Sequence, residues 1–249
     1  MSRFELPEFY LGSGGGSSIR IPDLENVPLN ARVEAVIDHP AFQRLRTIRQ
    51  LGPTHLVYPG AVHTRFEHSL GVYKSVLDFL ESLLRNPNFA DSVQENDLLA
   101  ILAAGLLHDV GHYPFAHSLE ALHLKGRDTP RHEDVGGAII RGEIDHLRGD
   151  RTLAEILRDD WEVDPDRVIR LCNGRLGEEA SKVDRLLYSI ISGAIDADKM
   201  DYLARDSHHM GVPYGRNYDR DRLLASLTLN ADGDGIALTS KGKIPAEMF

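Results

Sequence analysis

Cysteine is almost absent from this 249-residue chain, and Cys172 is the only one. A single thiol excludes an internal disulfide and a cysteine-rich zinc site, and it fits a reducing cytoplasm. Long apolar runs are also missing, because the longest, residues 98–107, falls short of the roughly 18 to 20 residues that span a bilayer. The first residues lack an apolar core followed by a cleavage site. We therefore expect a cytoplasmic protein that does not enter a membrane.

An excess of positive charge is missing as well. The formal net charge is −10, which argues against indiscriminate binding of polyanions by the whole surface. A local basic pocket remains compatible with this charge, so binding of nucleic acid stays open, and any phosphate ligand must be met by particular residues. The length suits one large domain with a proper core.

The composition divides the chain at one place. Residues 11–18 are rich in glycine and serine, so we expect residues 1–18 to form a flexible N-terminal segment and a single domain to occupy residues 19–249. Residues 245–248 resemble the first turn of another helix, because proline is favoured at that position. This pattern predicts a domain that continues beyond Phe249, in a chain that is truncated.

Apolar residues recur at spacings of three and four over most of the chain, which indicates helices. The expected helices cover residues 39–52, 65–86, 95–108, 114–122, 132–142, 152–160, 165–173, 182–193 and 196–211. Start signals lie at Asn96 or Asp97 and at Asp164 with Pro165, and stop signals lie at Gly52, Gly174 and Gly211. Residues 223–242 alternate around a DGDG turn and predict a hairpin. The expected fold is mostly α, with a small β-hairpin near the C-terminus.

Residues 106–117, LLHDVGHYPFAH, place three histidines and an aspartate at the end of an apolar run. Such groups are costly to bury unless a hydrogen-bond network or a metal ion pairs with them. His108 and Asp109 are adjacent, so they can share one metal only near a helix end, where the geometry relaxes. Imidazole nitrogen beside carboxylate oxygen suits a divalent transition ion. His108 and Asp109 would supply only part of the ligands of a metal site.

Two other segments supply candidate partners. Upstream, HTRFEHSLG contains His63, Arg65 and His68, and downstream DADKMDYLARD carries Asp198, Tyr202 and Asp206 at i, i+4 and i+8 on one helix face, with Lys199 beside them. Taken singly, the histidines are compatible with ordinary core residues and the acidic segment with a solvated face. The order His, His-Asp, Asp, each at the edge of an apolar helix, favours a shared site.

These motifs resemble the HD superfamily of metal-dependent phosphohydrolases, whose signature is His, His-Asp and Asp on helices. DHPAFQRLRTIRQLG, HTRFEHSLGV, GLLHDVGHYPFAH and DADKMDYLARDSHHMG are similar, in order and spacing, to the deoxynucleoside triphosphate triphosphohydrolases, including the vertebrate family member that joins a sterile alpha motif to an HD domain. The resemblance spans about residues 19–249 and implies an HD-domain helical fold.

The resemblance also implies roles for individual residues. The implied metal ligands are His68, His108, Asp109 and Asp198. The implied catalytic residues are His112, His117, His132 and Glu120. At the position of Glu120 the vertebrate member has an aspartate. The carboxylate that would orient a catalytic histidine therefore stands on a longer side chain here. The implied substrate-binding residues are Arg65 and Lys199 for the triphosphate, Tyr202 and Asp206 near the sugar, and Gln50 and Leu51 close to the deoxyribose.

An activator site is a further implication. Asp38, Gln43 and Arg46 match positions that read a guanine activator in the vertebrate member. The alternative is an amphipathic helix with a basic outer face, and both interpretations stay open. A homo-oligomer and a nucleotide activator are the partners that the family implies, besides the deoxynucleoside triphosphate substrate.

The implied reaction is metal-assisted hydrolysis that releases a deoxynucleoside and intact triphosphate, with manganese, iron, nickel, zinc or magnesium as the divalent ion and a histidine moving the proton. A wall formed by Leu51 and Tyr202 would disfavour a 2′-hydroxyl. Two alternatives remain at this point. One is an HD-type phosphodiesterase or nuclease acting on oligonucleotides or signalling nucleotides, and the other is a nucleotide-binding sensor.

Overall fold

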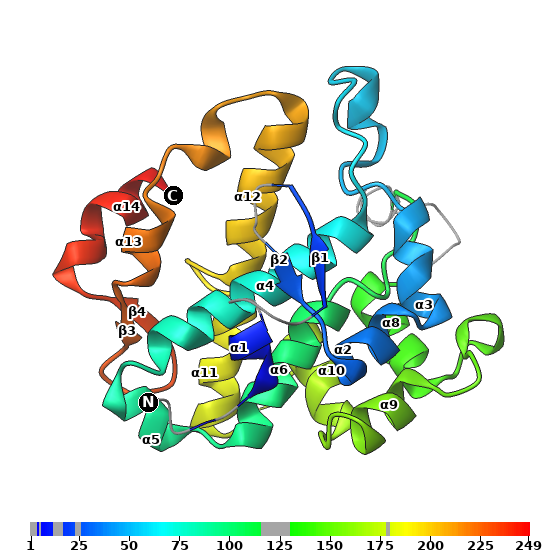
Figure 1. Ribbon diagram of the computed structural model, residues 1–249, viewed down its shortest axis with the longest axis horizontal. Helices are drawn as coiled ribbons and strands as arrows, with labels where there is room; N and C mark the ends of the chain where they lie inside the picture. The colour runs from blue at the N-terminus through cyan, green and yellow to red at the C-terminus, as the bar shows by residue number, and fades with distance from the viewer. Residues whose placement is uncertain (1–3, 5, 12–16, 23–25, 116–129, 178–179) are drawn as a thin grey trace.

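The computed structural model describes residues 4, 6–11, 17–22, 26–115, 130–177 and 180–249. Helices dominate this part of the chain (Figure 1). They are α1 (Pro7–Leu11), α2 (Ala31–Ile37), α3 (Pro40–Gln43), α4 (Arg65–Leu83), α5 (Pro87–Ser92), α6 (Glu95–Leu107), α8 (His132–Arg141), α9 (Leu153–Asp159), α10 (Pro165–Asn173), α11 (Lys182–Ile191), α12 (Ala197–Met210), α13 (Arg220–Leu224) and α14 (Lys243–Met248), with 3-10 turns η1 (Arg44–Thr47), η2 (Gly52–Leu56), η3 (Asp145–Leu147), η4 (Tyr214–Arg216) and η5 (Ser240–Gly242).

Two antiparallel strand pairs occur in the described part of the chain. β3 (Leu227–Leu229) pairs with β4 (Ile236–Leu238) around the DGDG turn, which confirms the predicted hairpin. β1 (Ser18–Arg20) pairs with β2 (Asn26–Pro28), and this pairing was not predicted. The mostly α fold with a small hairpin near the C-terminus is therefore confirmed. No helix in the described ranges is long and apolar enough to cross a bilayer.

Three helices form the centre of the molecule. α6 is buried from Asp97 to Leu107, as expected for a helix that is apolar on every side. α4 packs against both α6 and α12, and these helices lie together in Figure 1. The N-terminal ends of α4 and α12 lie near the C-terminal end of α6. The polar residues at these three helix ends therefore meet at the edge of the core.

The N-terminal boundary differs from the expectation. Residues 1–18 were expected to lie outside the fold, but Leu6 and Glu8 are buried, with exposures of 0% and 2%. The Glu8 carboxylate accepts hydrogen bonds of 2.6 Å from Nε and Nη2 of Arg32. This long-range ion pair anchors α1 to α2, and local composition gives no sign of it.

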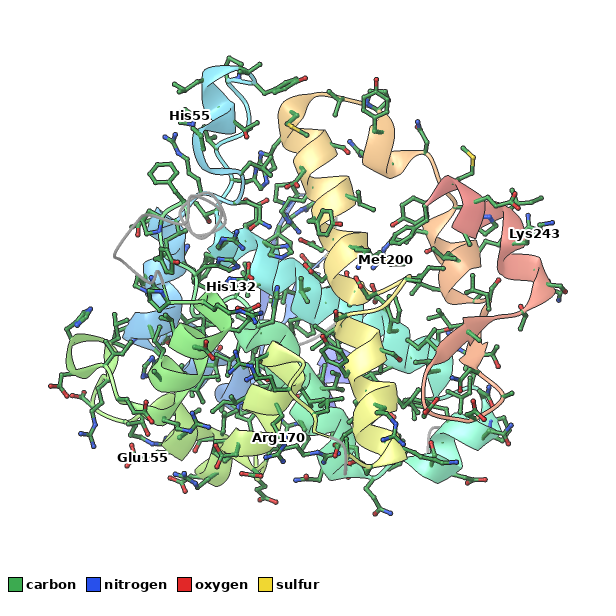
Figure 2. The ribbon with its side chains drawn as sticks, turned by 180° about the vertical axis from the view of Figure 1, so that it is seen from behind. His55, His132, Glu155, Arg170, Met200 and Lys243 are labelled. Carbon is green, nitrogen blue, oxygen red and sulfur yellow. The ribbon has the colours of Figure 1, made fainter. Side chains whose placement is uncertain are left out.

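Residues 39–52 also differ from the single helix that was expected. Pro40 opens α3, which tightens into η1 and stops at Ile48, where the backbone is extended at φ −106° and ψ 112°. The Ile48 carbonyl then accepts a hydrogen bond from the Arg65 amide, and the Gln50 amide donates to the His63 carbonyl. These two bonds hold together the ends of the loop formed by residues 50–63, and the outer part of this loop carries His55 in Figure 2. They also bring Gln50 close to the start of α4.

The helix ends follow the sequence signals in part. Asp164 caps α10 with Pro165 in the first turn, and Gly174 and Gly211 end α10 and α12 in left-handed conformations. The cap of α6 is Gln94, not Asn96 or Asp97. Asp97 stands at the third helical position and accepts a hydrogen bond from the Gln94 amide, so it forms the other half of a capping box.

Candidate metal centre and its cavity

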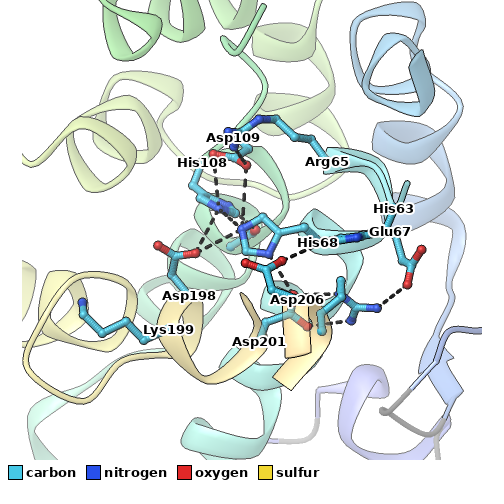
Figure 3. A network of polar contacts seen from close by, with 12 residues as sticks. His63, Arg65, Glu67, His68, His108, Asp109, Asp198, Lys199, Asp201 and Asp206 are labelled. Carbon is cyan, nitrogen blue, oxygen red and sulfur yellow. Dashed lines mark hydrogen bonds and ion pairs between the residues drawn. The ribbon is translucent and has the colours of Figure 1, made fainter. Parts of the chain in front are cut away.

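Three side chains from three helices meet at the edge of the core. His68 lies in the first turns of α4, His108 is the C-terminal cap of α6, and Asp198 is in the first turn of α12. Nε2 of His68 lies 3.3 Å from Nε2 of His108 and 3.0 Å from Oδ1 of Asp198. One ligand atom of each residue lies within 4.8 Å of the others. Figure 3 shows the three groups converging.

This donor set fits a divalent metal ion. Two imidazole nitrogens and a carboxylate oxygen are ligands of borderline transition ions, and the three atoms already face one point. Burial alone would lower the pKa of His68, but hydrogen bonds to the Asp198 and Asp201 carboxylates raise it to about 10. The site therefore holds a positive charge strongly, and a bound divalent ion would take the place of that proton.

Asp109, the fourth expected ligand, lies slightly apart from the other three. Its Oδ2 is 3.7 Å from Nε2 of His68 and accepts a 2.5 Å hydrogen bond from Nη1 of Arg65. Its Oδ1 is 3.1 Å from Nε2 of His112. Although burial alone would raise it, the pKa of Asp109 is held well below its usual range, chiefly by the Arg65 charge. The carboxylate is ionised, but Asp109 is not among the three residues whose ligand atoms all lie within 4.8 Å of one another.

His112 and His132 form a stacked pair beside Asp109. Their ring centroids are 3.8 Å apart and their planes differ by 13°. Gly111 permits this arrangement, because a Cβ atom there would lie 2.0 Å from the His132 carbonyl oxygen and 2.3 Å from the Gly136 nitrogen. The start of α8 can therefore rest directly on the backbone that follows Asp109. Burial lowers the pKa of His112 to about 4, against the opposing effect of the Asp109 carboxylate.

A cavity of about 540 Å³ opens over the cluster. The expected site residues along its wall are Gln50, Leu51, Arg65, His68, His108, Asp109, His112, His132, Asp198, Tyr202 and Asp206. Asp198, Tyr202 and Asp206 share this wall, as one face of α12 requires. The side-chain oxygen of Gln50 is buried and finds no hydrogen-bond partner within the described residues.

Lys199 is the expected phosphate-binding residue that does not line the cavity. Its Nζ lies 2.6 Å from Oδ2 of Asp196 and donates to the Gly193 carbonyl. Figure 3 shows the side chain directed away from the cluster. Asp196 caps α12 through the Lys199 amide, so the lysine head is held by the residue that starts its own helix.

Several cavity residues received no role from the sequence. Among the described residues, the wall also includes Glu133, Cys172, Asn173, Tyr188, Ile191 and Ser192. His63 stands behind it, with Nε2 2.7 Å from Oδ1 of Asp206 and its ring stacked on His209 at a centroid distance of 4.3 Å. Its position two residues before Arg65 was the available signal, but the pairing with Asp206 joins residues 143 positions apart.

Some expected residues lie elsewhere. His117 and Glu120 fall outside the described residues. Three residues matched to an activator site do not line the cavity: Asp38 follows α2, Gln43 is the last residue of α3, and Arg46 lies in η1. Arg46 donates to the Gln43 side chain at 2.7 Å, and its guanidinium carbon lies 3.5 Å from the Phe66 ring centroid. Their role in nucleotide binding stays a prediction.

Comparison with known proteins gives a consistent picture. A family model described as the HD domain matches residues 65–206. The uncharacterized protein YwfO of Bacillus subtilis is 40% identical over 191 residues, which cover 74% of this chain and 37% of that protein. Deoxynucleoside triphosphate triphosphohydrolase SAMHD1 of Gallus gallus is 35% identical over 230 residues, which cover 80% of this chain and 35% of that protein. The chain thus spans well under half the length of these relatives.

Solved structures show the same similarity in three dimensions. A hypothetical protein from Aquifex aeolicus superposes with a TM-score of 0.73 at 33% identity, covering 94% of this chain and 56% of the other. A phosphohydrolase from Bacteroides thetaiotaomicron gives a TM-score of 0.72 at 31% identity, covering 94% of this chain and 52% of the other.

Proposed function

This chain belongs to the HD-domain family, and we propose that it hydrolyses deoxynucleoside triphosphates to a deoxynucleoside and intact triphosphate. The observation that carries this proposal is the single cavity in which Arg65, the His68–His108–Asp198 cluster and the Tyr202–Asp206 face of α12 lie together. Its volume of about 540 Å³ is in the range of small-molecule sites. The similarity to SAMHD1 supports the choice of substrate.

The proposed metal ligands are His68, His108 and Asp198, with Asp109 beside them. A bound divalent ion would polarise a phosphate oxygen and make a water molecule more acidic. Arg65 uses one of its five N–H donors on Asp109, so the same guanidinium can also bind a phosphate oxygen.

His112 is the group we assign to proton movement. With its low pKa the ring is neutral near pH 7, so it can accept the proton that the attacking water loses. The Asp109 carboxylate beside Nε2 stabilises the charged ring that results. The same ring can then pass the proton to the departing sugar oxygen. His132, stacked on His112, keeps the ring in this orientation.

The sugar is assigned to the other side of the cavity. The buried Gln50 side-chain oxygen and the Asp206 carboxylate are acceptors for a sugar hydroxyl. Leu51 and Tyr202 line the same cavity, and a tight wall of these two side chains under the sugar would leave little room for a 2′-hydroxyl. We therefore propose that deoxynucleotides are preferred to ribonucleotides.

Product identity tests the proposal. The chain, supplied with Mn²⁺, is incubated with each deoxynucleoside triphosphate and each ribonucleoside triphosphate, alone and with a guanine nucleotide as activator. Anion-exchange chromatography should show deoxynucleoside and triphosphate in equal amounts. Monophosphates released only from an oligonucleotide or a cyclic dinucleotide would indicate the phosphodiesterase alternative. Tight nucleotide binding without turnover would indicate a sensor. Light scattering of the same sample tests the expected homo-oligomer.

A further inference from the structure

A second row of charged residues lies directly behind the proposed metal ligands. His68 is 1% exposed, and its two ring nitrogens face different ways. Nε2 faces His108 and Asp198, whereas Nδ1 lies 2.8 Å from Oδ2 of Asp201, which is itself 2% exposed. Asp198 and Asp201 are three residues apart on α12, so one turn of this helix contacts both sides of the same imidazole (Figure 3).

Asp201 is held in a fixed orientation by Arg205. Nε of Arg205 donates to Oδ2 of Asp201 at 2.9 Å, and Nη2 donates to Oδ1 at 2.6 Å. The fork is bidentate, which fixes the plane of the carboxylate as well as its position. Nη1 of Arg205 donates to Oε1 of Glu67 at 2.6 Å, so the buried guanidinium is itself held from α4.

Gly71 provides the space for this ion pair. It lies three residues after His68 in α4 and faces α12. A Cβ atom at position 71 would lie 1.8 Å from Oδ1 of Asp201 and 2.4 Å from Nη2 of Arg205. Any side chain at this position would therefore force the pair away from His68. The sequence HSLG therefore contains both the proposed ligand His68 and the glycine that leaves room for Asp201 beside it.

We propose that Asp201 is a positioning residue for the metal centre, held by Arg205 in the space that Gly71 leaves open. By accepting a hydrogen bond from Nδ1–H of His68, it fixes the tautomer that leaves the Nε2 lone pair free for a bound ion, and it fixes the angle of the ring. Carboxylates behind metal-bound histidines raise the basicity of the ligand in this way, and their loss typically lowers metal affinity by about 10- to 100-fold. The inference rests on the proposed metal centre, but not on the identity of the substrate.

The rival explanation is a purely structural ion pair that holds α12 against α4. Asp97 offers a matched control, because it is also a largely buried aspartate and accepts a 2.6 Å hydrogen bond from Arg167 in a different part of the fold. Asp97→Asn and Asp201→Asn each remove one buried carboxylate charge from an arginine. Only the second removes the carboxylate charge that lies behind His68.

Calorimetric titration of the metal-free protein with Mn²⁺, paired with thermal unfolding, separates the two explanations. We expect Asp201→Asn to weaken Mn²⁺ binding by about 10- to 100-fold, and Asp97→Asn to lower the unfolding temperature with unchanged Mn²⁺ affinity. Equal Mn²⁺ affinities of the wild-type protein and a folded Asp201→Asn variant overturn the inference. So does an equal loss of affinity in both variants.

A second variant keeps the test decisive if Asp201→Asn does not fold. Arg205→Lys leaves the Asp201 carboxylate and a positive charge in place but removes the bidentate fork, and we expect a smaller loss of Mn²⁺ affinity than for Asp201→Asn. Wild-type affinity in Arg205→Lys overturns the role assigned to the fork. A wild-type chain that binds Mn²⁺ but releases no triphosphate contradicts the proposed substrate alone, whereas one that binds no Mn²⁺ contradicts both proposals.

Discussion

Nε2 of His68 and Nε2 of His108 face each other at 3.3 Å, although both are the same kind of nitrogen on the same kind of ring. Two lone pairs at this distance repel, and two N–H groups clash, so the pair needs a shared cation or proton between them. Oδ1 of Asp198 lies 3.0 Å from Nε2 of His68 and adds a third electron-pair donor. One bound cation would satisfy all three donors.

Removal of a proposed ligand should therefore abolish turnover. We expect His108→Ala and Asp198→Ala to lower triphosphate release by at least about 100-fold, because the metal supplies several kcal/mol of charge stabilisation. Elemental analysis should show loss of bound metal in both variants, and dialysis of the wild-type protein against a chelator should give the same inactivity, reversed by a divalent ion. Asp150→Asn, at an exposed position, serves as the control. Full activity in the chelated protein would falsify the metal-dependent mechanism.

His112 should separate proton movement from metal binding. His112→Gln retains an N–H donor toward Asp109 but cannot transfer a proton near neutral pH, so we expect about a 100-fold or greater loss of turnover with Mn²⁺ affinity almost unchanged. Turnover assays and Mn²⁺ titration of the same preparation give both quantities. His146→Ala, at an exposed position in η3, should match the wild-type protein. If His112→Gln retains wild-type turnover, the proton-handling role is wrong.

His63 should affect substrate binding more than the rate at saturation. His63→Phe keeps an aromatic ring stacked on His209 but removes the 2.7 Å hydrogen bond to Asp206. One lost charge-assisted bond predicts a rise in KM of about tenfold, with a smaller change in kcat. Steady-state kinetics measure both, and His209→Phe, which leaves the His63–Asp206 bond in place, is the matched variant. A change of kcat alone would contradict this assignment.

His39 should make the stability of the fold depend on pH. Nδ1 of this buried ring accepts a hydrogen bond from the Ala41 amide, and Nε2 lies 3.0 Å from the carbonyl oxygens of Arg148 and Arg151. Burial lowers the pKa of His39 below its ordinary value of 6.5. The neutral ring therefore stabilises the folded state fully above about pH 6.5, and this contribution is lost as the pH falls below that value.

Urea unfolding between pH 5 and pH 8 measures this effect. His39→Asn retains an N-cap acceptor for α3 but loses the bridge to the two carbonyls, so it should be less stable by about 1 kcal/mol at pH 8. Its stability should fall less between pH 8 and pH 5 than that of the wild-type protein. Identical pH profiles would show that His39 does not contribute.

Local sequence patterns predicted much of this structure. Helical spacing and caps located the helices that carry His68, His108 and Asp198, since each has a clear apolar face or a strong terminal signal. Asp198, Tyr202 and Asp206 line one cavity because a spacing of four residues keeps them on one face of α12.

The features that the sequence did not predict have two causes. Some depend on contacts between distant segments, and others on which neighbouring residue binds a side chain within one short segment. The Glu8–Arg32 ion pair anchors a helix that composition assigned to a flexible segment, and the extended backbone at Ile48 is paired through its carbonyl with the amide of the distant Arg65. Lys199 illustrates the second case, because Asp196 takes its ammonium group at the helix cap. The partnership of Asp201 with His68 and Gly71 appears only when α4 and α12 are packed together.

The different roles of three acidic residues along α12 restrict insertions and deletions in this helix. Within three turns it supplies a proposed ligand at Asp198, the residue behind His68 at Asp201, and an acidic group of the cavity at Asp206. A single inserted residue would rotate everything after it by about 100°, so Asp206 would leave the cavity while Asp198 stayed. The number of residues between Asp198 and Asp206 is therefore constrained, because an insertion or deletion there would turn every later side chain off its present face of α12.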